Sequence, residues 1–543
     1  MIQIDKNLIQ QLFDQAVVNP RLRQSYDLRT EATDIELGHK DNSQRILNAL
    51  MPGTKVPIHR HPNSNETALC LCGKLVEILY EEDSADVDFP MGMDAQDVPN
   101  GVRLKESARF MLDPAAGNFG CVVPAGVWHM SEAGLEQKYV KEAFDTNWVV
   151  PMGPNVNAFE KDLEAFANSK SDGSEALDRK VVCLSAGTAA VHLALIGCGV
   201  KAGDEVLVQS FTFCASSHPI TYLGAKPVFV GSEDETWNMD PALLEKAILD
   251  RKAKTGKLPK AIVPVALYGM PYRIDEIMAI ADRYGIPVVE DAAEGMGSRF
   301  NGQVLGTFGK YGVLSFNGNK MITTSGGGAL ICRNAEDANE VMWYATQARD
   351  AYPYYQHTAI GYNYRMSNVC AGIGCGQMTV VNDHIAHHKH VQSLYEELLK
   401  DVRGVHIHKQ PADKRYDANF WLCAATLDAD VKIQGQENAY KEVIKTAVGG
   451  AAGVIHAVDS AVTDCQPNEN VEALRVFMLA KKVECRPVWK PMHKQPVYAD
   501  APVYTNGVEE KLFKVGFCLP AGPYVTDDDV RYIVECIKEA IVG

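Results

Sequence analysis

The sequence predicts a multidomain protein with an N-terminal β-barrel, an α/β body and a small C-terminal α+β domain. A chain of 543 residues is too long for one hydrophobic core. Two histidines alternate along an early strand-like segment, as barrel strands allow. Farther along, apolar β-rich runs alternate with helical patterns over roughly two hundred residues, which is typical of a largely parallel sheet covered by helices on both faces. We place these three parts at residues 1–140, 141–385 and 386–543.

Composition and charge are those of an ordinary globular protein of the cytoplasm. Hydrophobic residues make up 46% of the chain and charged residues 22%. The formal net charge of −16 argues against nucleic acid or an anionic membrane as a partner. The N-terminus does not read as a signal peptide, and no apolar run approaches the roughly 18 residues that span a bilayer. The 14 cysteines are scattered without a CxxC pair, as in reduced cytoplasmic proteins.

Four side chains in the first part of the chain could share one metal ion. His59 and His61 alternate along a strand-like segment, so both imidazoles face the same side. Glu66 follows closely, and a turn before His129 places a third imidazole on another strand. Three imidazoles and one carboxylate suit Fe, Mn, Ni or Zn with coordination positions left open. The alternative is that the histidines only form hydrogen bonds inside a barrel.

The spacing of these residues resembles the cupin family. The first cupin motif is matched throughout, whereas the glycine expected before the second motif is displaced by one residue. The matching residues are Gly53, His59, His61, Glu66 and Gly73, then Pro124, Gly126 and His129. Over residues 1–140 the chain resembles the WbuC family of small cupin metalloproteins, which occur among polysaccharide genes. The resemblance implies a divalent metal at His59, His61, Glu66 and His129, in a barrel whose role is catalytic, ligand-binding or purely structural.

The α/β body is expected to carry its site at the carboxyl ends of its strands. The apolar runs predict strands at residues 181–184, 205–208, 227–230, 261–267 and 287–289. Gly187 and Thr188 follow the first of these strands at the start of a helix, where free amides and the helix dipole attract phosphate.

Four further residues near strand ends have a chemical use. Phe213 could stack on an aromatic ring, and Asp291 could face a pyridine nitrogen and keep it protonated. Ser315 could add a hydroxyl to the phosphate site, and Lys320 lies in a glycine-rich turn where its amine could form a Schiff base. Each has a plainer alternative: Phe213 can fill the core, Asp291 can cap a helix, and Lys320 can be solvated. Their order along the chain is that of fold-type I pyridoxal 5'-phosphate enzymes.

From about residue 142 to the C-terminus, the chain resembles the DegT/DnrJ family of sugar aminotransferases. It is most similar to the branch that aminates UDP-linked 4-keto-6-deoxy-N-acetylhexosamines, as in bacillosamine synthesis. The matching motifs are distributed over the whole region and lie at Asn147–Gly153, Ser185–His192, Ser210–Ser216, Glu290–Gly297, Ser315–Lys320, Thr323–Gly328, Gly361–Met366 and Cys485–His493.

The resemblance implies a role for each matched position around the cofactor. Lys320 would hold pyridoxal 5'-phosphate and shuttle protons, Asp291 would pair with the pyridinium nitrogen, and Phe213 would stack on the ring. The phosphate would be bound by Gly187, Thr188, Ser315 and, from the neighbouring subunit, Asn363. An active site shared in this way implies a homodimer. Family members that remove a hydroxyl carry histidine in place of the lysine, so Lys320 favours amino transfer.

The same resemblance implies a nucleotide-sugar pocket and one position that departs from many relatives. The pocket would be lined by Asn147, Trp148, Val149, Val150, Arg486, Pro487, Val488, Trp489 and His493. Many relatives carry Gln or His where this chain has Glu294, near the phenolic oxygen of the cofactor. We interpret this glutamate as typical of the bacillosamine-type branch.

Two features of the C-terminal part have open interpretations. Residues 428–468 resemble no part of the family's usual connection and form an extra segment of about 30–40 residues, by default a surface insertion. The alternatives for it are a contact with the barrel or with substrate. Arg486, Lys490 and His493 gather positive charge that would suit a diphosphate, although an ordinary solvated basic face is the alternative.

The function predicted from these patterns is a two-step transamination. Glutamate would load the cofactor with an amino group, which would then pass to the C4 ketone of a nucleotide-linked sugar. A rival within enzymes is a 3-keto-sugar aminotransferase in which the cupin acts as the 3,4-ketoisomerase. A rival of another class is a cofactor-binding regulatory or scaffold protein, which the complete set of pyridoxal residues disfavours.

Overall fold

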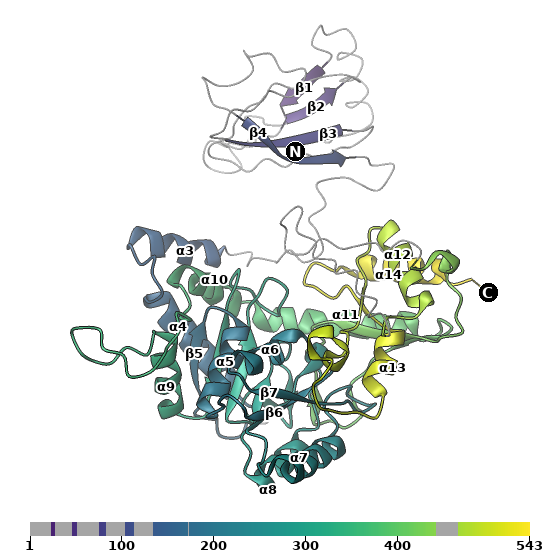
Figure 1. The fold of residues 1–543 in the computed structure, drawn as a ribbon. Helices are drawn as coiled ribbons and strands as arrows, with labels where there is room; N and C mark the ends of the chain where they lie inside the picture. The colour runs from purple at the N-terminus through teal and green to yellow at the C-terminus, as the bar shows by residue number, and fades with distance from the viewer. Residues whose placement is uncertain are drawn as a thin grey trace. The chain divides into compact units, whose positions relative to one another are not determined.

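The computed structural model describes residues 23–27, 46–50, 75–82, 104–112, 134–171, 173–440 and 465–542. The chain separates into two compact units, Met1–Pro124 and Ala125–Gly543 (Figure 1). In the first unit, the described residues form two antiparallel strand pairs. β1 (Arg23–Asp27) pairs with β2 (Ile46–Leu50), and β3 (Leu75–Glu82) pairs with β4 (Leu104–Leu112).

These strands do not include the residues of the predicted metal site in the N-terminal part. His59, His61, Glu66 and His129 all lie outside the described residues. The cupin barrel and its metal therefore stay predictions, as does the boundary at residue 140.

The second unit is built on two four-stranded sheets joined edge to edge by parallel bridges, Ile262 with Val288 and Val265 with Asp291. The combined strand order is β18-β7-β6-β8-β9-β12-β13-β5. β13 is antiparallel to both neighbours, and the other described pairs are parallel. The strands are β5 (Lys180–Leu184), β6 (Glu205–Gln209), β7 (Lys226–Val230), β8 (Ala261–Val263), β9 (Val289–Asp291), β12 (Tyr311–Ser315), β13 (Gly328–Cys332) and β18 (Val503–Tyr504).

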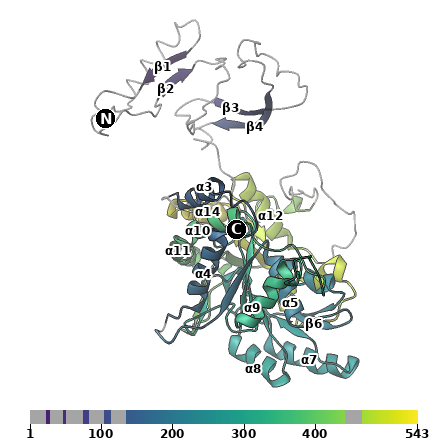
Figure 2. The same ribbon diagram turned by 90° about the vertical axis from the view of Figure 1, so that its left-hand side faces the viewer.

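Helices cover both faces of this sheet (Figures 1 and 2). The core on one face includes Phe159 of α4, Leu244 of α7 and Ile277 of α8. The core on the other face includes Leu193 of α5 and Val341 of α9. The sheet is therefore buried on both sides, as its apolar strands predict. The helices of this body are α3 (Leu135–Asp145), α4 (Pro154–Asn168), α5 (Gly187–Gly197), α6 (His218–Tyr222), α7 (Pro241–Thr255), α8 (Ile274–Tyr284), α9 (Ala335–Ala345) and α10 (Asn368–Met378).

Helices α3 and α4 dock on α10 through a close backbone approach. An added Cβ at Gly376 would lie 2.5 Å from the Glu136 nitrogen, so only glycine permits this contact. The Asn368 side chain accepts a hydrogen bond from the amide of Asn155 at 2.9 Å, at the start of α4. Because α4 follows a glycine that cannot cap it, Asn368 supplies that cap from a distant part of the chain.

The C-terminal part adds an antiparallel sheet in the order β14-β16-β19-β17. Its core includes Tyr395, Leu474 and Ile537 from the three helices that pack on it. A small sheet, β11-β10-β15, contains residues from both sides of the predicted boundary at residue 385, so that boundary stays a prediction. These elements are α11 (Val381–Leu399), α12 (Glu469–Ala480), α13 (Val508–Val515), α14 (Asp527–Ala540), β10 (Arg299–Phe300), β11 (Gln303–Val304), β14 (Val405–Ile407), β15 (Tyr416–Asp417), β16 (Cys423–Leu427), β17 (Arg486–Pro487) and β19 (Gly516–Leu519).

Two further sequence-based expectations concern the extra segment at residues 428–468 and the absence of a membrane-spanning segment. Most of the predicted extra segment, residues 441–464, lies outside the described residues. Within the part of the chain that the structure describes, no helix is both long and apolar enough to cross a membrane.

Candidate active site

Three chain segments converge where helix α5 begins. An added Cβ at Gly187, the first residue of α5, would lie 2.9 Å from Cβ of Ser315 at the end of β12. An added Cβ at Gly328 would lie 2.4 Å from the Gly187 nitrogen. The residue before the helix is Ala186, whose side chain cannot accept a hydrogen bond from the first amides. The structure thus brings Gly187, Thr188 and Ser315 together around a helix N-terminus with free amides, an arrangement that suits a phosphate.

Asp291 ends strand β9 and is buried, with 5% of its surface exposed. One carboxylate oxygen accepts a hydrogen bond from the Ser216 hydroxyl at 2.6 Å, and the other accepts one from the Ala293 amide at 3.2 Å. Burial raises the pKa of Asp291 above its usual value. The two hydrogen bonds and the charge of Lys320 oppose that shift.

Lys320 lies beside a second buried carboxylate. Its side chain is 11% exposed, and its Nζ lies 3.4 Å from Oε1 of Glu294. The same Nζ is 4.1 Å from the centre of the Trp421 ring, within the range of a cation–π contact. The other Glu294 oxygen accepts a hydrogen bond from the Tyr268 amide at 2.8 Å. Burial raises the pKa of Glu294, although Lys320 and the Tyr268 amide oppose the shift.

A cavity of about 470 Å³, within the size range of small-molecule sites, opens at the turn that carries Thr212 and Phe213. Phe213 is 48% exposed, and the centre of its ring lies 5.3 Å from that of Trp489. The Trp489 amide donates to the Tyr268 hydroxyl at 2.8 Å. The indole Nε1 of Trp489 is buried without a hydrogen-bond partner among the described residues. The cavity is lined by Thr212, Phe213, Cys214, His218, Trp489, Lys490, Met492, Gln495 and Val497.

The predicted cluster of positive charge near the C-terminus is divided. Lys490 lines the cavity, whereas the Arg486 guanidinium pairs with neighbouring Glu484. His493 lies between Ser210, whose Oγ is 2.6 Å from Nδ1, and Glu510, whose Oε1 is 2.9 Å from Nε2. Both ring nitrogens therefore face protein groups.

The other residues predicted to line the sugar pocket, and Asn363 of the predicted phosphate site, do not line the cavity described above; the structure gives them the following neighbours. Pro487 pairs with β19. Val488 is buried, and an added Cβ at Gly516 would lie 2.7 Å from its Cγ2. Asn147, Trp148, Val149 and Val150 form an exposed turn whose described backbone hydrogen bonds run to α3 and α10. Asn363 pairs with Thr346 in an antiparallel bridge. The contact of these pocket residues with substrate, and that of Asn363 with the phosphate of the neighbouring subunit, stay predictions.

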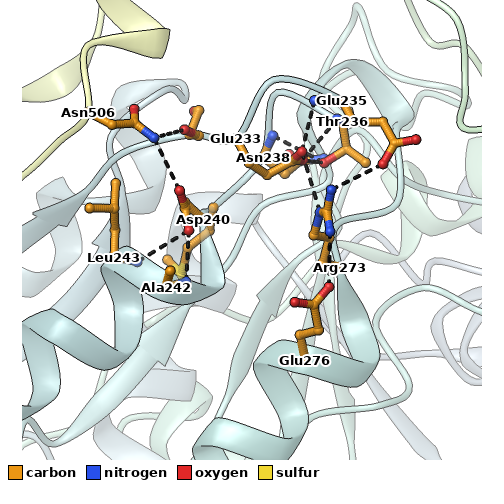
Figure 3. Close-up of polar contacts among 12 residues, drawn as sticks. Glu233, Glu235, Thr236, Asn238, Asp240, Ala242, Leu243, Arg273, Glu276 and Asn506 are labelled. Atoms are coloured by element: carbon orange, nitrogen blue, oxygen red, sulfur yellow. Dashed lines mark hydrogen bonds and ion pairs between the residues drawn. The ribbon is translucent and has the colours of Figure 1, made fainter.

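Buried amide side chains, which the sequence analysis missed, fix the loops around the site. The Gln209 amide donates to Asn238 Oδ1 at 3.1 Å, and that oxygen also accepts from the Leu267 amide at 3.0 Å. This pair ties the end of β6 to the turn that presents Tyr268. In the loop that carries Asn238, Glu233 accepts a hydrogen bond from the Thr236 amide. The Arg273 guanidinium lies among the carboxylates of Glu233, Glu235 and Glu276 (Figure 3).

Tyr268 and Trp421 are two further residues at the site that sequence reasoning missed. Tyr268 directly follows the predicted strand at residues 261–267, so its place at a strand end was an available signal. Trp421 lies far along the chain from Lys320 and outside the central sheet, and no pattern around it indicated the contact.

The geometry of this site accords with the family that the chain matches. Residues 131–456 and 436–538 match the DegT/DnrJ/EryC1/StrS aminotransferase family. The chain belongs to this family. It is 39% identical over 413 residues to "Putative pyridoxal phosphate-dependent aminotransferase EpsN" of Bacillus subtilis (strain 168). The matched region covers 75% of this chain and 93% of that protein. It is 31% identical over 413 residues to GDP-perosamine synthase of Escherichia coli O157:H7, covering 76% and 97% respectively.

Solved structures of aminotransferases share the fold of this family member. A DegT DnrJ EryC1 StrS aminotransferase from Brucella abortus matches with a TM-score of 0.62 at 25% identity, over 75% of this chain and 95% of that one. "Putative sugar aminotransferase Spr1654 from Streptococcus pneumoniae, PLP-form" has a TM-score of 0.62 at 20% identity, over 77% and 98%. The protein is thus a pyridoxal-phosphate-dependent aminotransferase with the fold-type I architecture that the sequence predicts. Separately, residues 4–88 match DUF6016, a domain of unknown function.

The residues present fit pyridoxal 5'-phosphate. The space that a Cβ at Gly187 would fill, next to Ser315 and an uncapped helix start, suits the phosphate. Asp291 is a buried carboxylate, as a partner of the pyridine nitrogen must be, and Lys320 is the amine beside it. The exposed ring of Phe213 offers a stacking surface.

Proposed function

We propose that this aminotransferase transfers the amino group of glutamate to the C4 ketone of a nucleotide-linked 4-keto-6-deoxy sugar. The expected sugar is a UDP-linked N-acetylhexosamine, and the products are 2-oxoglutarate and an amino sugar for polysaccharide or glycan biosynthesis. The observation that carries this proposal is the convergence of Lys320, Asp291 and the Gly187–Ser315 cradle in a member of this family.

Lys320 is the group that moves protons in the proposed reaction. Pyridoxal 5'-phosphate supplies, when bound, a carrier for the amino group and a sink for the electron pair at the reacting carbon. The Nζ of Lys320 removes the proton from the α-carbon of the donor. It then delivers a proton to C4 of the sugar, and the side of delivery fixes the new stereocentre. Glu294 and Trp421 hold this Nζ in a largely buried place, which limits exchange of its proton with solvent.

The other residues of the site bind and orient. Asp291 favours the protonated form of the pyridine nitrogen, because an adjacent carboxylate stabilises the positive charge. Gly187, Thr188 and Ser315 bind the phosphate through amides and a hydroxyl. Phe213 stacks on the ring.

The cavity beside Phe213 is the proposed entrance for the sugar nucleotide. Lys490, the one lysine among the described residues that line it, provides a positive charge for an anionic group, and the unpaired Nε1 of Trp489, another lining residue, is the proposed donor. The names of two relatives support a nucleotide sugar: GDP-perosamine synthase and, over 46% of this chain and 65% of that protein, UDP-2-acetamido-2-deoxy-3-oxo-D-glucuronate aminotransferase.

The proposal includes a homodimer and an N-terminal metal domain. Asn363 would reach the phosphate of the neighbouring subunit, and residues 147–150 with Arg486–Trp489 and His493 would border the sugar pocket. His59, His61, Glu66 and His129 would hold Fe, Mn, Ni or Zn in a cupin barrel.

The test is mass spectrometry of the full-length protein incubated with pyridoxal phosphate, glutamate and a panel of UDP-, GDP- and dTDP-linked 4-keto and 3-keto sugars. We expect amination of UDP-linked 4-keto-N-acetyl sugars, with 2-oxoglutarate formed in equal amount. Conversion of no sugar in the panel, by protein that has bound the cofactor, would contradict the proposal.

A second candidate is a bifunctional enzyme that acts on a 3-keto sugar. The similarity to an aminotransferase named for a 3-oxo sugar favours it. In that case a 4-keto dTDP sugar gives a 3-amino product, and replacing His59 and His61 together abolishes this product while a supplied 3-keto sugar is still aminated.

A further inference from the structure

The carboxylate of Asp291 is reached by a short chain of hydroxyl groups. The Ser216 hydroxyl donates to Oδ2 of Asp291 at 2.6 Å. The Thr212 hydroxyl lies 2.8 Å from that of Ser216. Both hydroxyl residues are buried, with 3% of Thr212 and 1% of Ser216 exposed. Thr212 also lines the cavity, so the chain of hydroxyls leads from the substrate side to the carboxylate.

Counting hydrogens fixes the direction of these bonds when Asp291 is ionised. A serine hydroxyl has one hydrogen, and a carboxylate can only accept. Because Ser216 gives its hydrogen to Asp291, the bond between Thr212 and Ser216 must be donated by Thr212. Each donation strengthens the next, since a hydroxyl that accepts a hydrogen bond becomes a better donor.

The same short turn carries the stacking residue of the proposed cofactor site. Thr212 and Phe213 precede a 3-10 helix at Cys214–Ser216, and the Ser216 amide donates to the Phe213 carbonyl at 3.3 Å. The hydroxyl chain and Phe213 therefore belong to one turn, although the bond from Ser216 to Phe213 joins backbone atoms and the bonds to Asp291 and Thr212 join side chains.

We propose that Ser216 and Thr212 are positioning residues that hold Asp291 ionised and aimed at the cofactor, with Ser216 acting directly and Thr212 acting through Ser216. This inference rests on the proposed role of Asp291. Among the described residues, Lys320 and Glu294 are the charged groups that interact electrostatically with Asp291. Lys320 favours the ionised form and Glu294 opposes it. Burial raises the pKa of Asp291. Without the hydroxyl chain, the described groups that oppose this rise are Lys320 and the Ala293 amide.

The structure offers a matched control for Ser216 in the next residue. Ser217 is fully buried as well, but its hydroxyl donates to the Cys214 carbonyl at 3.2 Å. Ser216→Ala and Ser217→Ala therefore remove the same atoms from the same turn. Thr212→Val removes the second hydroxyl with little change of shape, and Thr212→Ser retains it.

The experiment measures release of pyridoxal phosphate from the full-length holoenzyme on dilution, and the pH dependence of the cofactor's absorbance. For Ser216→Ala we expect about 10-fold weaker retention of the cofactor, because a hydrogen bond to a charged group is lost. The loss should grow as the pH falls, since Asp291 is protonated more easily. Thr212→Val should weaken retention by about 3-fold, and Thr212→Ser and Ser217→Ala should retain the cofactor as the wild type does.

Two further variants separate this inference from the proposed function. In an Asp291→Asn background, Ser216→Ala should add no further loss of cofactor and no further pH shift. If Asp291→Asn itself leaves cofactor binding and its pH dependence unchanged, the proposed role of Asp291 is wrong. If Asp291→Asn weakens binding but Ser216→Ala matches Ser217→Ala, only the positioning role is overturned. Should Ser216→Ala fail to fold, wild-type behaviour of Thr212→Val overturns the inference.

Discussion

The cofactor side and the cavity side of the active site differ in how completely their polar groups are paired. On the cofactor side, both oxygens of Asp291 and both oxygens of Glu294 have partners within the chain. On the cavity side, Phe213 is about half exposed and the indole N–H of Trp489 has no partner among the described residues. The cofactor side is thus pre-organised, whereas the cavity side keeps a partly exposed aromatic residue and, among the described residues, an unpaired indole N–H.

This difference has a physical reason. A buried carboxylate is costly unless hydrogen bonds and a nearby positive charge stabilise it, so the cofactor side must be complete before binding. An aromatic wall such as Phe213 and Trp489 loses little by facing water, and it gains when a ligand covers it. Substitutions on the two sides should therefore change different measured quantities.

The largest expected effect comes from the lysine of the cofactor side. Lys320→Ala should lower the rate of sugar amination by at least about 10²–10⁴-fold, because proton transfer at the reacting carbons is lost. The substitution also removes the charge that pairs with buried Glu294, so folding of the variant is checked by its thermal denaturation. Lys320→Arg retains positive charge near Glu294 and Trp421, so it separates charge from proton transfer. Near wild-type amination by either variant, followed by mass spectrometry, would show that Lys320 is not the proton carrier.

A smaller but still large effect is expected at the phosphate cradle. Gly187→Ala places a Cβ 2.9 Å from Cβ of Ser315, so the start of α5 must shift. We expect a loss of about 1–3 kcal/mol in cofactor binding, measured by titration with pyridoxal phosphate. The control is Gly326→Ala in the glycine-rich turn that follows Lys320, where an added Cβ meets no atom within 4 Å. Equal cofactor affinity of the two variants would count against a phosphate site at Gly187.

The positions that the sequence predicted best are those defined by strand ends. Gly187, Ser315 and Asp291 follow from the rule that sites lie at the carboxyl ends of strands, and their order gave the fold type. Lys320 lies in the turn between two adjacent strands, so its neighbourhood was also fixed by local structure.

The partners of these groups could not be predicted, because they come from parts of the chain that meet only in the folded state. Trp421 approaches Lys320 from outside the central sheet, and Tyr268 reaches Glu294 through a backbone amide that any residue could supply. His493 was expected to gather positive charge with Lys490, but its ring nitrogens face Ser210 and Glu510. Motif spacing gives the residue type at a position and does not give the direction of its side chain.

On the cavity side, the unpaired indole N–H of Trp489 leads to a prediction that separates substrate binding from cofactor binding. Trp489→Phe should leave thermal stability and cofactor binding nearly unchanged, because the missing N–H has no described partner to lose. It should raise KM for the sugar nucleotide by about 3- to 10-fold, as expected for one hydrogen bond made only to the ligand. The control is Trp343→Phe on helix α9, outside the cavity lining. A change in cofactor affinity instead of KM would break the comparison between the two sides.

The smallest expected effect tests the cost of the buried charge on Glu294. Burial raises the pKa of this carboxyl above its ordinary value of 4.5 in the folded protein. A raised folded pKa means that the contribution to stability is complete below 4.5 and is lost as the pH rises through the folded pKa. Glu294→Gln removes this titration. The stability of the variant relative to wild type should therefore increase with pH above 4.5, by no more than about 1.4 kcal/mol per pH unit.

The measurement is urea denaturation of the apo forms of wild type and Glu294→Gln between pH 4 and 8. The control is Glu336→Gln on the exposed first turn of α9, which removes a surface carboxylate and leaves Glu294 in place. If Glu294→Gln gives a constant difference from wild type, then its hydrogen bond from Tyr268 and its ion pair with Lys320 fully offset burial. The cofactor side would then carry both charges without cost, and its pre-organisation would be more complete than the raised pKa indicates.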